Sequence, residues 1–341
     1  MMPCSMSRRQ IPLVLMLVLC LAEQALAADM LVTPFRTANR SPQAHIFGIP
    51  SETSPETVPQ GRTELSLTLD LASTYTVNAT PRERIVLDGE SYRWTLAARY
   101  GVRDRLEAGI EIPFLEQGGG FLDSFIIDWH RIFQLPQGGR DSAPRNRFGY
   151  RYDRDGSRRL TMERSGGGIG DISLSAAFTL YEAHPADEYD SLVLRGQLKL
   201  PTGDSTELRG SGSTDTTLYL CGGMNRQTEW GMLGVFGSAG AMVLSRGAVL
   251  ADQQNNLVGV GGAGFGWGPT PWISFKFQIN GHTPLYRGSS LTELSSASLM
   301  LTSGGALLLP GGYLLDIGVS EDVAVATAPD VTFHLGVSKR F

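Results

Sequence analysis

The sequence is poor in cysteine, with three in 341 residues. Cys4 and Cys20 lie in an N-terminal segment that we expect to be removed, so the mature chain would keep only Cys221. A chain with one cysteine forms no intramolecular disulfide, and its fold has to be stabilised in another way. The formal net charge of −5 lacks the basic excess of nucleic-acid-binding proteins, so we expect no nucleic acid partner.

Long hydrophobic runs are confined to the N-terminus. Two arginines precede the apolar run 11–22, and the triplet "ALA" at 25–27 has the small-x-small pattern of a cleavage site. We therefore expect residues 1–27 to be a cleaved signal peptide. A transmembrane helix would need a run of about 18 apolar residues, and the sequence contains no such run after residue 27. The mature chain is then periplasmic, secreted or an outer-membrane β-barrel.

Recognisable catalytic and metal-binding patterns are absent from the sequence. It contains no "GxSxG" nucleophile elbow, no "HExxH" and no Cys/His cluster with metal-ligand spacing. We expect no catalytic residue, metal or cofactor. An outer-membrane hydrolase stays a weaker alternative, for which His282 near Ser289 and Ser290 is the one candidate pairing. The histidines are scattered: His45, His130, His184, His282 and His334.

What the sequence does contain is alternation of apolar and polar residues with period two. The segment "LSLTLDL" at 65–71 places four leucines on one face and polar residues on the other, as an extended strand requires. Many such runs reach ten residues or more, the length that crosses a bilayer at a tilt. We predict twelve strands, near 62–77, 86–101, 105–116, 169–182, 189–201, 212–225, 231–246, 255–267, 272–282, 293–309, 312–321 and 329–341.

The connections support a membrane barrel over a soluble β-sandwich. The links from an even-numbered predicted strand to the next odd-numbered one are short, as in "VRDR" at 102–105. Several links from an odd-numbered strand to the next even-numbered one are long, above all 117–168. Short periplasmic turns and longer outer loops are typical of transmembrane barrels in the bacterial outer membrane. The fold class we predict is all-β, an up-and-down antiparallel β-barrel over residues 61–341.

The C-terminal strand "VTFHLGVSKRF" ends abruptly on an aromatic residue. Its apolar side chains point one way, and a last strand must pair with the first to close a barrel. This ending is similar to the signal read by the barrel-assembly machinery, which we expect as a partner. The predicted signal consists of Phe333, Leu335, Val337 and Phe341.

Four longer stretches together resemble an uncharacterised Gram-negative outer-membrane family, domain-of-unknown-function family 3187. They are "RSPQAHIFGIP" at 40–50, "GGGFLDSFIIDWH", "LKLPTGD" followed by "GSGSTD", and "SEDVAVATAPDVTFHLGV". The resemblance covers nearly the whole mature chain and implies the barrel fold and the outer membrane, but no activity. "LPTGD" is also similar to barrels associated with aromatic-degradation gene clusters, which implies a transport role.

Charged residues on the polar faces of the strands are candidates for the lumen wall. The first three predicted strands carry acids, then arginines, then acids, which sets Arg99 beside Glu107 across the turn and Glu111 nearer Thr95. This pattern fits either a polar constriction that selects solutes or structural filling by paired charges. The candidates are Glu64, Asp70, Arg93, Arg99, Glu107, Glu111, Arg195, Lys199 and Lys276.

Three segments do not read as strands. Residues 28–60 predict an irregular periplasmic arm or lumen plug. Residues 121–135, with Phe125, Trp129 and Phe133 at helical spacing, predict an amphipathic helix in the long outer loop. That helix could lie on the outer leaflet, plug the lumen or cap the pore. The basic segment 145–159 is a candidate contact for lipopolysaccharide phosphates in the outer-membrane lipid.

The predicted function is that of a restricted or gated channel for small solutes, with apolar or aromatic ones favoured by the resemblance. A twelve-strand barrel lies between filled eight-strand and open sixteen-strand barrels, so one arm or helix could obstruct its lumen. A structural or adhesive barrel without transport is the alternative. The sequence does not identify the solute.

Overall fold

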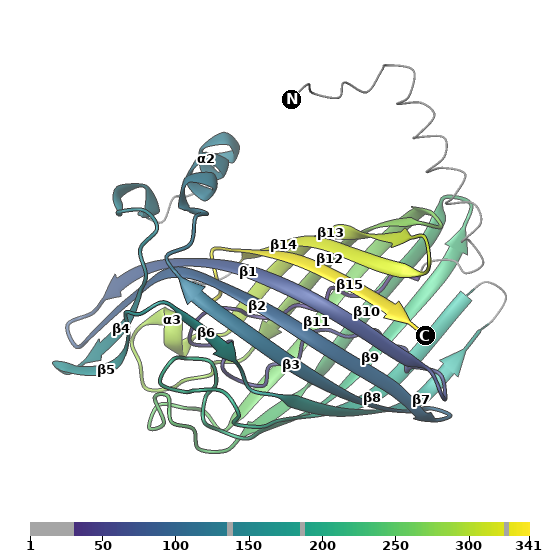
Figure 1. Cartoon of the computed structure of the whole chain (residues 1–341), viewed down its shortest axis with the longest axis horizontal. Coiled ribbons are helices and arrows are strands. Elements are labelled where there is room, and N and C mark those ends of the chain that lie inside the picture. The colour runs from purple at the N-terminus through teal and green to yellow at the C-terminus, as the bar shows by residue number, and fades with distance from the viewer. Residues whose placement is uncertain (1–30, 135–138, 185–187, 324–326) are drawn as a thin grey trace, which may run out of the picture.

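The computed structural model describes residues 31–134, 139–184, 188–323 and 327–341, and the predicted signal peptide at 1–27 lies outside them. The described chain folds into a closed antiparallel barrel of twelve strands, as predicted (Figure 1). Within these ranges no helix is long and apolar enough to cross a bilayer.

The wall strands follow one another in chain order around the barrel. They are β1 (Thr63–Ala79), β2 (Glu83–Arg103), β3 (Leu106–Gly118), β7 (Ser173–Ala183), β8 (Glu188–Lys199), β9 (Asp215–Thr228), β10 (Gly231–Leu244), β11 (Leu257–Thr270), β12 (Ile273–His282), β13 (Ser298–Leu309), β14 (Tyr313–Asp322) and β15 (Val331–Arg340). The connections hold β4 (Gly149–Arg154), β5 (Ser157–Met162), β6 (Gly166–Ile169), helices α2 (Asp123–Phe133) and α3 (Thr292–Ser295), and the 3₁₀ turn η1 (Arg140–Ser142).

Pairing of the last strand with the first closes the wall. β15 runs antiparallel to β1 from the Glu64–Arg340 pair to the Ser73–Val331 pair. Beyond β15, the N–H of Phe341 donates to the carbonyl of Thr63 (2.8 Å). The chain is therefore paired to its final residue and leaves no edge at the seam.

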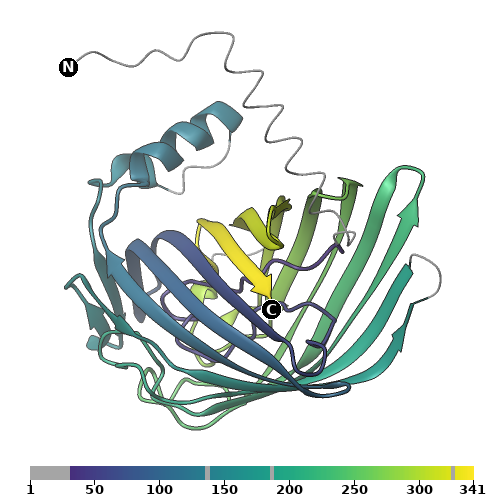
Figure 2. The same cartoon turned by 45° about the vertical axis from the view of Figure 1, so that its right-hand side comes forward.

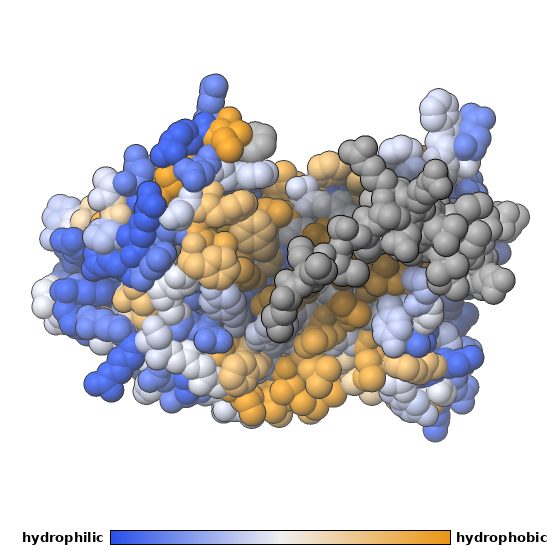
Figure 3. Space-filling model, turned by 45° about the horizontal axis from the view of Figure 1, so that its top comes forward, coloured by the Kyte–Doolittle hydropathy of each residue, from blue (hydrophilic) through white to orange (hydrophobic). Residues whose placement is uncertain are grey.

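The period-two pattern separates a lipid-facing surface from a polar lumen. On β1, the side chain of Leu67 is 47% exposed and that of its neighbour Thr68 is 6% exposed. The same alternation around the barrel gives a hydrophobic band between hydrophilic ends (Figure 3). Such a band is what hydrocarbon contact requires.

We expect Leu198→Arg on β8 to impair membrane assembly far more than Gln197→Arg. Leu198 faces outward and is exposed, whereas Gln197 lines the lumen. An arginine facing lipid costs up to about 2–4 kcal/mol at the midplane and less toward the interfaces, a cost that a lumen position avoids. The fraction of heat-modifiable barrel in purified outer membranes measures the difference. Equal fractions for the two variants would contradict the assigned faces.

The two ends of the barrel differ in their connections. Short turns join β2–β3, β9–β10, β11–β12 and β13–β14 at the end where the C-terminus lies, and long loops occupy the other end (Figure 1). By the rule for bacterial barrels, the end with the short turns and the C-terminus is periplasmic and the other end is extracellular.

The longest loop is more structured than we predicted. β4 and β5 form a hairpin that extends β2 beyond the barrel, and β6 adds to β3. The basic segment 145–159, read from sequence as a loop tip, therefore contains β4 and the start of β5. We did not predict these strands because charged residues surround the alternation. Within it, Tyr150 and Tyr152 point inward and are buried.

Residues 31–60 run inside the barrel as an irregular chain, drawn in dark purple in Figure 2. Most of their side chains are buried, including charged and polar ones such as Arg40 and Gln43. We call this segment the arm. Its contacts with the inner wall define the candidate site.

Candidate functional site

The arm enters and leaves the lumen at the periplasmic end. The N–H of Val32 donates to a side chain near the periplasmic end of β9 (2.9 Å). Asn39 contacts the ring of His282 at the extracellular end of β12 (3.0 Å). Val58 then donates from its N–H to Glu107 near the β2–β3 turn (2.8 Å). The arm is therefore a loop that rises through the lumen and returns.

Inward-facing glycines make room for the arm on one side of the wall. A Cβ atom on Gly234 of β10 would lie 2.5 Å from the Cβ of Val32, and one on Gly262 of β11 would lie 2.5 Å from a carboxylate oxygen of Glu52. Real Cβ atoms do not approach so closely, so larger residues would displace the arm. These two glycine-rich strands, β10 and β11, provide the surface on which the arm is seated.

A charged cluster near the periplasmic end joins four wall strands, β1, β2, β3 and β8, to the arm. Glu107 accepts from Arg195 of β8 (2.7 Å) and from Arg99 of β2 (3.3 Å), and Arg99 also pairs with Glu64 of β1. Arg195 donates in addition to the backbone carbonyls of Ser54 (2.9 Å) and Glu56 in the arm. The cluster thus fixes the returning half of the arm to the wall.

Two further wall acids bind arginines of the arm. Asp70 accepts from Arg40 (2.6 Å) and contacts the ring of His334 on β15 (2.6 Å). Glu111 accepts from Arg36 (2.7 Å). We predicted that Glu111 would lie nearer Thr95, and the two residues line the same cavity. The ion-pair partner of Glu111 comes from the arm, a segment without strand periodicity from which no register could be read.

The two lysines also point into the lumen. Lys199 binds Asp171 and Asp215 and donates to the carbonyl of Ile46 in the arm (3.2 Å). Lys276 binds Asp316 and lies over the ring of Phe35 in the arm, 4.1 Å from its centroid. Buried ammonium groups need such partners, because an unpaired charge in a low-dielectric environment is costly.

Arg93 differs from the other lumen candidates. Its Nε has no hydrogen-bond partner among the described residues, and neither has the buried hydroxyl of Thr95. Both residues line a cavity between arm and wall with Arg36 and Arg40. The cavity volume of about 20 Å³ has room for roughly one water molecule. This cavity between arm and wall is therefore too small for a solute.

An apolar cluster closes the lumen at the extracellular end. The turn of the arm, including Ile46 and Phe47, packs there against side chains from the outer loops and from β4. Next to it, His45 is buried and contacts the carbonyl of Leu208 (2.8 Å). Burial lowers the pKa of His45 to about 4, so the imidazole is neutral at neutral pH.

The predicted assembly residues lie on β15 and just beyond it, with Leu335, Val337 and Phe341 exposed on the outer wall. Phe333 is partly covered, because it meets the ring of Phe125 from α2 at 5.8 Å between centroids. Their role in assembly stays a prediction. Lys339, the charged residue in this series, lies over the ring of Tyr313, 4.4 Å from its centroid.

Helix α2 lies on the outside of the barrel, at the extracellular end of β14 and β15. Of the three predicted positions, the contacts place it against the outer wall and away from the lumen. Phe125 and Trp129 are stacked on each other at 6.0 Å between centroids, and Phe133 is the last residue of the helix. The helix therefore does not obstruct the barrel.

The described residues do not bring the hydrolase candidates together. His282 contacts Asn39 and the carbonyl of Thr283, whereas Ser290 binds Glu83. Within the described ranges no group of three or more His, Cys, Asp or Glu side chains could hold a metal ion. The residues of the candidate site that the sequence missed are those of the arm, above all Arg36 and Arg40, which pair with the wall acids.

A closed barrel with a lipid-facing band and an occupied polar lumen is a bacterial outer-membrane β-barrel. The chain belongs to the DUF3187 family of proteins of unknown function, whose model matches residues 10–341. No curated protein matches the sequence.

Several solved structures are similar to this chain. The COG4313 outer membrane channel from Pseudomonas putida F1 is 15% identical, with a TM-score of 0.51, over 84% of this chain and 97% of that chain. The translocator domain of the autotransporter NalP from Neisseria meningitidis is 10% identical, with a TM-score of 0.35, over 82% and 88%. The P. putida toluene transporter TodX is 10% identical, with a TM-score of 0.30, over 93% and 96%. At these identities the likeness concerns the fold alone.

Proposed function

We propose that the protein is a restricted outer-membrane channel that the arm keeps closed. The observation that carries the proposal is that the arm lies buried inside the lumen. The side chains of a twelve-strand wall would not fill that lumen without the arm. A barrel needed only as an anchor could dispense with such a segment.

The character of the contacts supports an arm that moves. Most of its anchors are ion pairs and hydrogen bonds, such as Arg36–Glu111 and Arg40–Asp70, which water can replace. The wall behind them is polar and charged, so a lumen without the arm would fill with water and admit solutes. The charged cluster at Glu107 would keep such a pore narrow.

The outer mouth supports small solutes with apolar or aromatic parts. Solutes from outside meet the apolar cluster around Phe47, Leu250 and Tyr286 before they reach the polar lumen. A site of this kind favours apolar groups by removing them from water. We therefore keep small apolar or aromatic solutes as the proposed substrate class.

A reversible lock of the arm tests the proposal. An ideal Cβ on Gly223 of β9 lies 3.5 Å from the Cβ of Pro55, a separation that a disulfide spans. In a Cys221→Ser background, Gly223→Cys with Pro55→Cys is expected to abolish solute uptake into liposomes when oxidised. Reduction is expected to restore the uptake of the wild type.

The matched controls are Gly223→Cys with Pro55→Ser and Gly223→Ser with Pro55→Cys in the same background, and neither should respond to reduction. If neither the wild type nor the reduced double variant takes up ions or small solutes, the channel is refuted. The structural or adhesive barrel would then be the better account, because the same arm would serve as permanent filling.

A further inference from the structure

The outer surface at the extracellular rim carries an unusual pair of features, an apolar helix face and a group of arginines. Helix α2 is attached to the outer wall by Leu122 and Ile126, which are buried with Val331 and pack against outward side chains of β1, β14 and β15. This attachment fixes the helix beside the lipid-facing band and leaves Phe125, Trp129 and Ile132 of the helix exposed.

The uncovered face of α2 is large. Phe121, which precedes the helix, is 64% exposed, and Phe125, Trp129 and Ile132 on the helix are 49%, 41% and 73% exposed. Phe125 and Trp129 also border an apolar cleft against Val319 and Phe333 of the wall. Exposed patches of this kind mark a surface that a partner or a lipid covers.

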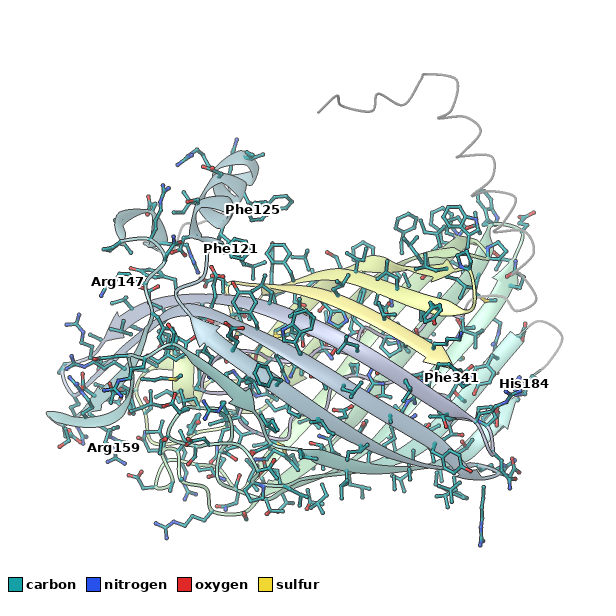
Figure 4. All side chains as sticks on the ribbon, viewed as in Figure 1. Phe121, Phe125, Arg147, Arg159, His184 and Phe341 are labelled. Carbon is teal, nitrogen blue, oxygen red and sulfur yellow. The ribbon has the colours of Figure 1, made fainter. Side chains whose placement is uncertain are left out.

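Arginines lie next to the start of the same helix. The N–H of Asn146 donates to Asp123 (2.7 Å) and Arg145 donates to Ser124 (3.0 Å), so segment 145–147 is fixed to the first turn of α2. Beside it, a cleft of about 580 Å³ opens on the outer face of β1, β2 and β4. Figure 4 shows Arg147, Phe121 and Phe125 at this end of the barrel.

The cleft combines positive charge with apolar wall. It is lined by three arginines, two outward valines and two carboxylates: Arg84, Arg147, Arg151, Val77, Val86, Asp88 and Glu163. Arg84 and Arg147 are exposed and make no ion pair within the described ranges. Most other arginines of the rim are paired, as Arg82 is with Asp155 (2.7 Å).

We propose that this surface binds the phosphorylated, acylated glycolipid of the outer leaflet, lipopolysaccharide, through its lipid A part. The acyl chains would cover the apolar face of α2, and a phosphate would bind Arg84 and Arg147, whose guanidinium groups match phosphate geometry. We do not propose inorganic phosphate as the ligand, because it has no acyl chains to cover the apolar face of α2. The proposal rests on the outer-membrane fold and not on channel activity.

The test compares two double variants that remove the same charge from the same rim. Arg84→Gln with Arg147→Gln removes the two unpaired arginines. Arg82→Gln with Arg158→Gln removes two exposed arginines that are paired with Asp155 and Asp153. Delipidated barrel is titrated with bisphosphorylated lipid A in detergent micelles, and native mass spectrometry counts the lipid bound to each barrel.

We expect the first double variant to bind lipid A about tenfold more weakly than the wild type, and the control to bind it unchanged. Dephosphorylated lipid A should bind the wild type as weakly as lipid A binds the first variant. Equal binding by both double variants would overturn the proposal. So would phosphatidylglycerol that binds as tightly as lipid A, or inorganic phosphate that displaces lipid A, since these results indicate a general anion site.

Discussion

Deletion of residues 31–58 is expected to raise ion conductance in planar lipid bilayers by at least about tenfold over the wild type. The deletion removes the chain that fills the lumen between β1, β8 and β12, together with the arginines that bind Asp70 and Glu111. The wall acids left behind would be exposed to water, which solvates them, so the barrel itself should assemble normally.

Deletion of residues 121–133 is the matched control for this experiment. The removed segment is also long, but it contains α2, which packs on the outer wall. Its loss should leave conductance at the wild-type level. If the arm deletion conducts no better than the wild type, wall side chains alone close the lumen, and the proposed gating is wrong.

The wall of the barrel could be predicted closely from the sequence because its physical cause is local. One face of each strand meets lipid and the other meets the lumen. Apolar and polar residues therefore alternate along the sequence of each strand. The last strand was predicted at 329–341 and is found at Val331–Arg340, and the first was predicted at 62–77 and is found at Thr63–Ala79.

The contacts in the lumen could be predicted only where strand register determines them. Arg99 and Glu107 flank the β2–β3 turn and meet at 3.3 Å, as their spacing indicates. The pairing of Arg40 with Asp70 joins an irregular segment to a strand, so no periodicity gives it. One signal was available: the inward glycines of β10 and β11 indicate close approach of another backbone.

Replacement of Glu107 by glutamine is expected to lower the free energy of unfolding by about 3–5 kcal/mol. Glu107 is buried, and it is the common acceptor for Arg99, Arg195 and the N–H of Val58. Glutamine keeps the size of the side chain but removes the charge, which leaves Arg195 buried without an ion-pair partner. Chemical denaturation in detergent, followed by tryptophan fluorescence, measures the change.

Asp155→Asn provides the comparison, because it also removes one carboxylate that binds an arginine. Asp155 and its partner Arg82 are exposed at the extracellular rim, where water solvates each charge on its own. The midpoint of denaturation should therefore move little in this variant and strongly in Glu107→Gln. Similar midpoints would mean that water reaches Glu107 in the closed barrel. In that case water would solvate the charges of the lumen wall. The arm would then neither neutralise these charges nor exclude water from them.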